Sequence, residues 1–286
     1  MPTPSSRPDR YALVGHPVEH SRSPLIHQLF AQQLGENLTY ELIDAAPSQF
    51  ETAVLGFAAA GGRGLNVTVP HKEAAFELCR IHGPEAVAAR AVNTITFTTG
   101  GLRGDNTDGL GFIRDLTVNN ERAIASRRVL LLGAGGAARG IAGPMLAEEP
   151  DALVIANRTI ERAEALRRDL GAPGNVSVCR FDELEDAGEF DIVVNATSAG
   201  LKGERPPFPG SLVRKKTFCY DLAYSLKATP FVTWAEANGA GWAVQGWGML
   251  VEQAAEAYAI WRGKRPETRE ILGKLLALSD RGAVAG

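Results

Sequence analysis

Two ionisable side chains stand where the sequence could support proton transfer. Lys72 ends the segment NVTVPHK (residues 66–72), just beyond a predicted strand and in the first turn of a predicted helix. A cation there opposes the helix dipole by ~0.3–1 kcal/mol, which favours proton donation. Asp108 ends the segment GDNTD (residues 104–108), and a carboxylate close to Lys72 would pair with it and fix where the proton lies. The alternatives are a solvated lysine and an aspartate that caps a helix.

Two hydroxyl groups precede a proline at the start of another predicted helix. They belong to Ser21 and Ser23, and the proline is Pro24. Hydroxyls at the positive end of a helix dipole would form a pocket for a carboxylate. The structural alternative is that Ser23 caps the helix and Pro24 takes its first position. That alternative leaves Ser21 without a role, so both interpretations stay open.

Glycines suited to holding a pyrophosphate follow an apolar strand predicted at residues 129–132. The segment GAGGAA (residues 133–138) allows a tight turn and close approach of a phosphate, whose charge suits the N-terminus of the next helix. An ordinary glycine-rich turn is the alternative. The cofactor contacts expected in this turn are Gly133, Ala134, Gly135, Gly136 and Ala137.

The end of the next predicted strand indicates which dinucleotide binds. An NAD site usually has an acidic residue there, which bonds the ribose 2′-hydroxyl. This chain instead has Asn157, Arg158 and Thr159, with Arg162 one turn later. Guanidinium groups form forked hydrogen bonds to a phosphate dianion, so NADP is favoured. Arginines that are simply solvated are the alternative.

A polar side chain interrupts the apolar stripe of the last predicted helix, at about residues 249–262. Gln253 lies on that stripe with Ala257 and Trp261. A buried amide needs partners, which are either neighbouring backbone groups or a ligand.

Metal chemistry is not expected from this sequence. His20 and His27 have no acidic cluster at ligand spacing, so we expect loop or core histidines and no metal site. Cys79 and Cys179 are expected to be small packing residues.

The elements that must position these residues alternate between strand and helix, which predicts an α/β fold. The first part predicts strands at 11–15, 39–43 and 64–69, a hairpin at 92–98 and 101–104, and helices from Pro24 to the stop at Gly35, near 49–60, and from Pro70. The second part predicts strands at 129–132, 152–156, 176–179, 190–195 and 217–220, and helices at 109–119, 139–148, 161–170 and 249–262. Apolar strands alternating with helices in this second part are typical of a parallel, doubly wound sheet.

Length and composition limit the class of protein. The chain has 286 residues, which corresponds to about two domains of ~150 residues. The net charge of −3 shows no overall excess of positive charge, such as binding to nucleic acid or to an anionic membrane would favour. No apolar run approaches the ~18 residues that span a bilayer, and residues 1–10 lack the apolar core of a signal peptide, so we expect a loose tail there. Three separated cysteines favour a reducing cytoplasm.

Several segments, taken in order, carry a more specific likeness. They are GHPVEHSRSP (15–24), NVTVPHK (66–72), AVNT (91–94), GDNTD (104–108), GAGGAA (133–138), NRT (157–159), NATSAG (195–200), DLAY (221–224) and GMLVEQ (248–253). Together these segments resemble those of the shikimate dehydrogenase family. Members of this family are NADP-dependent enzymes of aromatic amino-acid and chorismate biosynthesis. The resemblance extends from residue 11 to about residue 270.

The resemblance implies roles for individual residues. Lys72 and Asp108 would be the catalytic pair in the reversible reduction of 3-dehydroshikimate to shikimate by NADPH. Ser21 and Ser23 would hold the substrate carboxylate. The ring hydroxyls would be held by Asn93, Asp108 and Gln253, the pocket completed by Thr68 and Tyr224, and further NADP contacts made by Thr197 and Gly246.

The resemblance also implies the architecture and the partners. Two α/β domains are expected: a substrate domain with a mixed sheet, from residues 1–112 plus 246–286, and a Rossmann-type doubly wound NADP domain, residues 113–245. The protein would act as a monomer or homodimer on a small molecule, without nucleic acid or membrane.

Two residues differ from the family pattern, and two alternative functions stay open. Leu226 replaces the family's usual proline, so the loop that carries Tyr224 is expected to be less rigid, and Gln28 stands where asparagine is frequent. A quinate/shikimate dehydrogenase with a broader choice of substrate could use the same residues. A non-catalytic NADP-binding sensor is the rival from another class, although it would be expected to lack Lys72 or Asp108.

Overall fold

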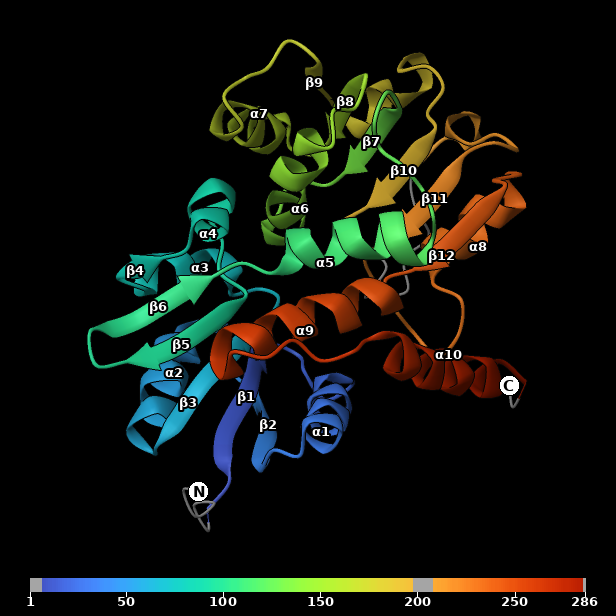
Figure 1. Cartoon of the computed structure of the whole chain (residues 1–286). Helices are drawn as coiled ribbons and strands as arrows, with labels where there is room; N and C mark the ends of the chain where they lie inside the picture. The colour runs from blue at the N-terminus through green and yellow to red at the C-terminus, as the bar shows by residue number, and fades with distance from the viewer. Residues whose placement is uncertain (1–6, 198–207, 285–286) are drawn as a thin grey trace. The chain divides into compact units, whose positions relative to one another are not determined.

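Two six-stranded sheets organise the chain, each inside one of two units (Figure 1). The computed structural model describes residues 7–197 and 208–284. The first unit is Met1–Asp108 with Val251–Ile271, and the second is Gly109–Leu250 with Leu272–Gly286. Most of the predicted tail lies outside the described residues, but Asp9 and Arg10 already belong to the first strand, so the tail is shorter than predicted.

The sheet of the first unit is mixed, as expected. Its strand order is β2-β1-β3-β5-β6-β4, with β1 parallel to β2 and β3, and β5 antiparallel to β3 and β6. The strands are β1 (Asp9–Gly15), β2 (Leu38–Asp44), β3 (Gly62–Val67), β4 (Ile81–His82), β5 (Thr94–Thr98) and β6 (Gly101–Asp105).

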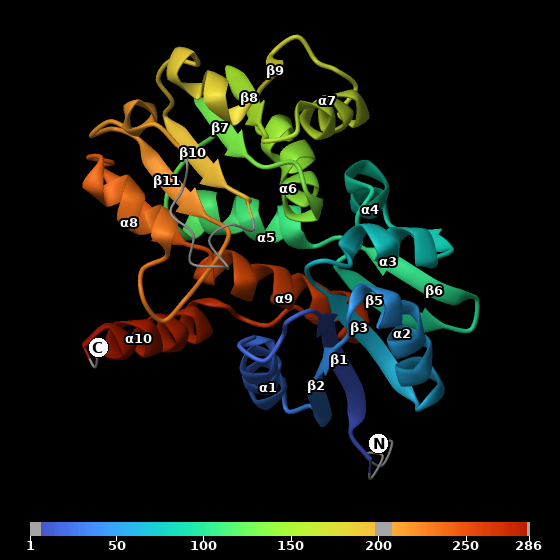
Figure 2. The ribbon, with the colours of Figure 1, turned by 180° about the vertical axis from the view of Figure 1, so that it is seen from behind.

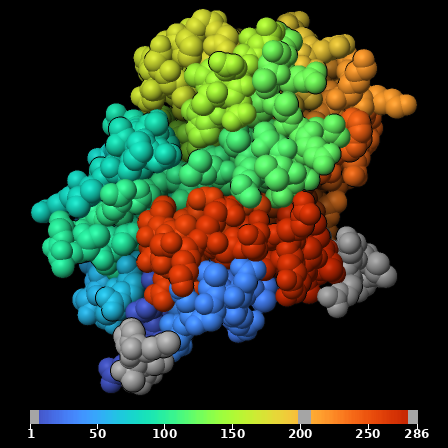
Figure 3. Space-filling view, in the orientation of Figure 1, coloured from blue at the N-terminus to red at the C-terminus, as the bar shows by residue number. Residues whose placement is uncertain are grey.

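Helices cover both faces of this sheet. One face packs against α2 (Phe50–Ala59), α3 (Lys72–Leu78) and α4 (Pro84–Ala89) through a buried apolar cluster. The other face meets α1 (Ser23–Leu34) and the end of α9 (Trp247–Arg262). Here Tyr11 stacks on Trp261 with ring centroids 4.6 Å apart, and Phe30 meets Tyr258 edge to face at 5.7 Å. Figure 3 shows the blue atoms of the α1 region directly beside the orange-red atoms of the α9 region.

The sheet of the second unit is entirely parallel, as predicted. Its order is β12-β11-β10-β7-β8-β9, the dinucleotide-binding arrangement in which the strand order reverses beside the first strand of the unit. The strands are β7 (Arg128–Leu132), β8 (Ala152–Ala156), β9 (Val176–Cys179), β10 (Ile192–Asn195), β11 (Phe218–Asp221) and β12 (Trp242–Gln245). The strands are apolar because both faces of the sheet are buried.

Each face of this sheet has its own set of helices (Figures 1 and 2). One apolar cluster joins the sheet to α5 (Asp108–Arg114), α6 (Gly136–Ala147) and α7 (Ile160–Asp169). The opposite cluster includes Phe231 and Trp234 of α8 (Pro230–Ala237). The chain ends in α10 (Arg269–Val284), and no helix within the described residues has both the length and the apolar character needed to cross a membrane.

Several predicted boundaries were wrong. Pro70 does not open a helix, because it lies in a turn closed by the His71 N–H on the Thr68 carbonyl, and α3 begins at Lys72. The helix after the glycine turn begins at Gly136, three residues before the prediction, because the first turn of a helix tolerates glycine. Elements that were not predicted include the short β4 and α4, as well as α8, β12 and α10.

Candidate active site

Lys72 and Asp108 form an ion pair in the first unit. Lys72 is the first residue of α3 and Asp108 is the first residue of α5. Lys72 Nζ lies 2.5 Å from Asp108 Oδ2, and the two side chains are only 12% and 4% exposed. The structure therefore brings together the two groups whose proximity the sequence could not establish. A partly buried ion pair of this kind can exchange a proton with a bound substrate.

Asn93 lies at the centre of the hydrogen bonds around this pair. Its Nδ2 donates to Asp108 Oδ1 at 2.8 Å and to Thr107 Oγ1 at 2.9 Å. Its Oδ1 accepts from the Thr107 N–H at 2.9 Å and from Thr94 Oγ1 at 2.8 Å. All of these groups are buried, so Asn93 holds the Asp108 carboxylate in one orientation.

The helix-cap alternative for Asp108 was wrong. The Asp108 N–H donates to Asn106 Oδ1 at 3.0 Å, and Asn106 Nδ2 donates to the Ala91 carbonyl at 2.9 Å. Asn106 thus satisfies the backbone at the start of α5 and leaves the Asp108 carboxylate to Lys72. This role of Asn106 was not predicted from the sequence, although asparagine two residues before a helix start is a known turn signal.

Ser21 and Ser23 lie together at the N-terminus of α1. The Ser23 N–H donates to Ser21 Oγ at 3.2 Å, and Ser21 Oγ donates to Ser23 Oγ at 3.2 Å. Ser23 is the first helical residue and its side chain does not cap the helix, so that alternative was wrong. Two neighbouring hydroxyls beside the first-turn amides of a 12-residue helix can together hold a carboxylate.

Thr68 and Gln253 complete the first-unit part of the predicted site. Thr68 lies in the turn between β3 and α3 and packs against Gly15. A Cβ on residue 15 would overlap the Thr68 methyl group. Gln253 lies on α9, and its Oε1 is 3.5 Å from Asn93 Nδ2. Ala257 on the predicted stripe of α9 is fully buried, but so are Val251 and Ala255 beside it, so the buried part of the helix is wider than predicted.

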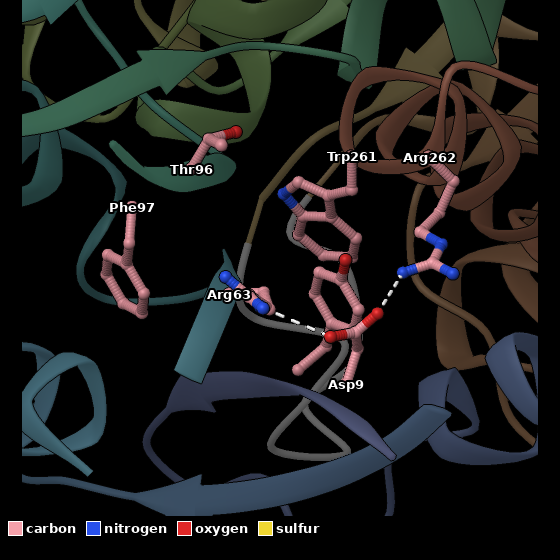
Figure 4. A pocket seen from close by; sticks show the side chains of 7 residues that line it. Asp9, Arg63, Thr96, Phe97, Trp261 and Arg262 are labelled. Carbon is pink, nitrogen blue, oxygen red and sulfur yellow. Dashed lines mark hydrogen bonds and ion pairs between the residues drawn. The ribbon is translucent and has the colours of Figure 1, made fainter. Parts of the chain in front are cut away.

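The end of α9 is anchored by ion pairs, which keep Gln253 in place within the unit. Arg262 bonds Glu36 at 2.6 Å and Asp9 at 2.5 Å, and Tyr258 also donates to Glu36 at 2.8 Å. Figure 4 shows Asp9 between Arg63 and Arg262 in a pocket of about 290 Å³. This pocket lies at the N-terminal ends of β1 and β3, whereas Lys72 follows the C-terminal end of β3. Because the charges of Arg262 and Asp9 are paired with each other, we assign the pocket a structural role.

The glycine turn of the second unit is open where a phosphate would approach. Gly133 has φ +107°, a conformation that L side chains rarely adopt, and a Cβ there would lie 3.0 Å from the Ala196 carbonyl oxygen. Gly135 directly precedes α6, and a Cβ there would meet no atom within 4 Å. Packing does not require this glycine, but a closely approaching ligand would. Gly136 and Ala137 supply the amides of the first turn of α6, while Ala134 is buried beside the turn.

The basic segment lies next to that turn. The Gly133 N–H donates to the carbonyl of Ala156, the last residue of β8, and Asn157 follows it directly. Asn157 Nδ2 donates to the Thr159 carbonyl at 2.8 Å. Arg158, Thr159 and Arg162 are exposed around the start of α7, so their side chains are accessible to a bound phosphate.

Thr197, Gly246 and Tyr224 follow other strands of the same sheet. Thr197 comes after β10, and Gly246 comes between β12 and α9, where its N–H donates to the Ala223 carbonyl at 3.0 Å. The Tyr224 ring lies 4.7 Å from the Trp247 ring. Tyr224 belongs to the second unit, so its role beside residues of the first unit stays a prediction. Residues 198–200 of the NATSAG segment lie outside the described residues.

His27, Cys79 and Cys219 are buried packing residues. His27 is buried and stacks on Tyr40 at 4.2 Å, and its burial lowers the pKa of the ring to about 3. Burial also raises the pKa of the thiols of Cys79 and Cys219 to about 12, so they stay protonated packing residues. In the part of the chain that the structure describes, no group of three or more His, Cys, Asp or Glu residues could hold a metal ion.

Three family models match the chain. The shikimate dehydrogenase substrate binding domain matches residues 13–95, the shikimate / quinate 5-dehydrogenase model matches residues 115–202, and the shikimate 5'-dehydrogenase C-terminal domain matches residues 246–276. The matched regions include the Ser21, Lys72 and Asn93 positions, the glycine turn, and Gln253.

Individual proteins are similar over almost the whole chain. A shikimate dehydrogenase (NADP(+)) from Alkalilimnicola ehrlichii is 52% identical over 267 residues, 93% of this chain and 98% of that protein. The crystal structure of an Ael1 enzyme from Pseudomonas putida is 46% identical, with a TM-score of 0.84 over 93% of this chain and 98% of that one. Shikimate 5-dehydrogenase from Thermus thermophilus, in complex with NADP(H) and shikimate, is 31% identical, with a TM-score of 0.81 over 96% and 99%.

Proposed function

The chain belongs to the shikimate dehydrogenase family, and from this premise we propose that it catalyses the reversible, NADPH-dependent reduction of 3-dehydroshikimate to shikimate. The observation that carries the proposal is the Lys72–Asp108 ion pair, held by Asn93 with Gln253 close by. This arrangement supplies one proton donor, one acceptor and two amides, which suits a ring that bears a carbonyl and several hydroxyls.

The cofactor that fits the second unit is NADP. The open glycine turn precedes a helix N-terminus at the point where the strand order reverses, which suits a pyrophosphate. Gly133, Gly135 and the first-turn amides of α6 would hold that group. Arg158 and Arg162 would hold the 2′-phosphate, and no acidic residue directly follows β8 to favour a free 2′-hydroxyl. When bound, NADPH supplies the hydride for the carbonyl carbon.

The side chains of this chain supply the proton and the orientation. As the carbonyl of 3-dehydroshikimate becomes an alkoxide, Lys72 Nζ donates a proton to that oxygen, and the reverse reaction returns it. Asp108 accepts a hydrogen bond from the neighbouring hydroxyl and keeps Lys72 directed at the reacting oxygen. Ser21 and Ser23 bind the carboxylate at the start of α1. Thr68, Asn93, Tyr224 and Gln253 complete the substrate contacts.

The experiment that tests this proposal follows the reduced nicotinamide by its absorbance. Purified protein is given shikimate or quinate with either NADP or NAD. We expect the highest kcat/KM for shikimate with NADP. The absence of turnover with every pair would contradict an enzymatic role and favour the NADP-binding sensor, although the intact Lys72–Asp108 pair argues against that rival.

A broader substrate choice is the second candidate. The model that matches residues 115–202 covers shikimate / quinate 5-dehydrogenases. Quinate has the same carboxylate and hydroxyls with one added hydroxyl, so the same residues could bind it. Comparable kcat/KM values for the two acids would establish this alternative.

We also propose that a substrate domain, expected as residues 1–112 with 246–286, and an NADP domain, expected as residues 113–245, correspond to the first and the second unit. The bounds of the units differ from this expectation chiefly in that Leu272–Gly286 belong to the second unit. The protein would work in the cytoplasm as a monomer or homodimer. Support comes from three free cysteines, two of them buried, which suit a reducing compartment. Sedimentation analysis would give the oligomeric state.

A further inference from the structure

Asp221 is a buried carboxylate that the proposed reaction does not use. It is the last residue of β11 and is 0% exposed. Its Oδ1 accepts hydrogen bonds from Asn195 Nδ2 at 2.9 Å and from the Ala223 N–H at 3.1 Å, and its Oδ2 accepts from Thr229 Oγ1 at 2.6 Å. Asp221 therefore joins the end of β10, the loop after β11 and the start of α8.

The Asp221 carboxylate and the Thr197 N–H together fix which way the Asn195 amide points. A carboxylate can only accept hydrogen bonds, so it selects the NH₂ group of Asn195. The amide oxygen is thereby directed to Thr197, whose N–H donates to it at 3.2 Å and whose hydroxyl donates at 2.7 Å. Two hydrogen bonds to one oxygen hold the backbone and the side chain of Thr197 together.

Thr197 lies where the sheet of the second unit would receive a dinucleotide. The strand order reverses between β7 and β10, and dinucleotides bind at such a reversal, at the carboxyl ends of the strands. The glycine turn follows β7, and Thr197 follows β10. The two loops touch, because the Ala196 carbonyl lies against Gly133.

The carboxylate is costly to keep in this place. Burial raises the pKa of Asp221 above its ordinary value, although the hydrogen bonds from Thr229, Ala223 and Asn195 offset part of this effect. Because the raised pKa means that the folded state disfavours the ionised form, a charged Asp221 does not add to stability at neutral pH. Neutral groups could join the same segments without that cost, so joining them does not by itself explain the charge.

We propose that Asp221 is a positioning residue for the cofactor: by orienting the Asn195 amide, it holds Thr197 in the conformation that contacts NADP. This inference rests on the proposed NADP-dependent function. Asp221 itself touches neither substrate nor cofactor in this role.

The test is Asp221→Asn. This variant keeps the shape of the side chain but replaces one acceptor oxygen with an NH₂ group, which donates hydrogen bonds. The new amide can face Asn195 with either its oxygen or its NH₂ group, so residue 221 no longer selects one orientation of the Asn195 amide, and the two Thr197 donors lose an acceptor held in one place. We expect the KM for NADP to rise about tenfold, the loss of roughly one good hydrogen bond, while the KM for shikimate stays within about twofold. The melting temperature should stay close to that of the wild type.

Thr229→Ala is the matched control. It removes the hydrogen bond to Asp221 Oδ2 and the cap on the Val232 N–H at the start of α8. Stability should fall, because the cap is lost, but Asn195 keeps its orientation, and the KM for NADP should stay within about twofold. Asn195→Ala should reproduce the Asp221→Asn effect on NADP, and the double variant should be no worse than either single variant.

Two outcomes would overturn the inference. One is an unchanged KM for NADP in Asp221→Asn. The other is a parallel loss of melting temperature and of both KM values, which would indicate a purely structural role. Direct titration with NADPH, followed by its fluorescence, separates this inference from the proposed reaction: a wild type that binds NADPH without turning over shikimate contradicts only the reaction. A wild type that does not bind NADPH contradicts both.

Discussion

The side-chain amide of Asn93 donates a 2.8 Å hydrogen bond to Oδ1 of Asp108, the carboxylate oxygen that Lys72 leaves unused. Asp108 is therefore held on both oxygens, by an amide on one and an ammonium on the other. This double contact fixes the direction of the Lys72–Asp108 pair and is the basis of the first two predictions.

Replacing Lys72 should reduce turnover and leave substrate binding nearly intact. Lys72→Ala removes the group that protonates the developing alkoxide, and we expect kcat to fall by about 10²–10⁴ while the KM for shikimate changes by no more than about twofold. Steady-state kinetics in both directions measure this. A large rise in KM at unchanged kcat would show that Lys72 binds substrate and is not the proton donor. Lys274→Ala, on α10, is the control and should behave like the wild type.

Replacing Asn93 should disturb both the ion pair and the fold. Asn93→Ala removes the acceptor of the Thr107 N–H and of Thr94 Oγ1, which are buried, and we expect a loss of about 1–3 kcal/mol in the free energy of unfolding. Asp108 also loses its amide contact. We therefore expect kcat/KM for shikimate to fall even at temperatures where the variant is fully folded, so that unfolding does not account for the loss. Urea unfolding and kinetics on the same preparation measure the two effects. Wild-type kinetics in a destabilised variant would mean that Asn93 serves the fold alone.

Two arginines should decide the choice between NADP and NAD. We expect the double variant Arg158→Gln, Arg162→Gln to raise the KM for NADP by about tenfold or more, because the 2′-phosphate loses its charged hydrogen bonds. The KM for NAD, which has no 2′-phosphate, should hardly change. Arg168→Gln is the control, since Arg168 is exposed near the other end of the same helix. An equal effect on both cofactors would place the two arginines outside the phosphate site.

His27 should make the protein less stable as the pH falls below 7. Burial lowers the pKa of His27 from 6.5 to about 3, so the unfolded chain binds a proton below pH 6.5 that the folded protein does not accept. This difference grows from pH 6.5 down to about pH 3 and amounts to about 2 kcal/mol between pH 7 and pH 5. His27→Phe should remove this part of the pH dependence, as measured by urea unfolding at the two pH values. His20→Gln is the control, because His20 is exposed, and an equally steep pH dependence in His27→Phe would refute the prediction.

Local features of the sequence predicted local structure well. Pro24 and Gly35 bracket a predicted helix, and α1 runs over Ser23–Leu34 with Gly35 in the left-handed conformation, φ 66°. The glycine turn after β7 and the apolar strands of the second unit were predicted for the same reason: backbone sterics and burial on both faces restrict which residues can occupy those places. The parallel sheet of the second unit agrees with this prediction, whereas the mixed sheet of the first unit was expected from the family resemblance.

Sequence position alone misjudged residues whose partners are distant. Asp108 suits a helix cap, yet its carboxylate goes to Lys72, 36 positions earlier, while Asn106 takes the backbone contact. Asp221 gave no signal beyond its place in a family segment, because its partners come from two other parts of the chain. Such choices depend on which groups the folded sheet places within hydrogen-bond distance.

The sequence by itself determined most of the elements, their order and the family, because steric preferences, apolar periodicity and family segments can be recognised residue by residue. Only the tertiary structure decided which side chains meet. Pairing of β3 with β5, and of β5 with β6, brings the ends of three strands together, as in the bonds from the Val67 N–H to the Asn93 carbonyl and from the Asn93 N–H to the Asp105 carbonyl. Lys72, Asn93 and Asp108 follow or precede those strand ends, so the register of the sheet, which no single segment encodes, forms the site.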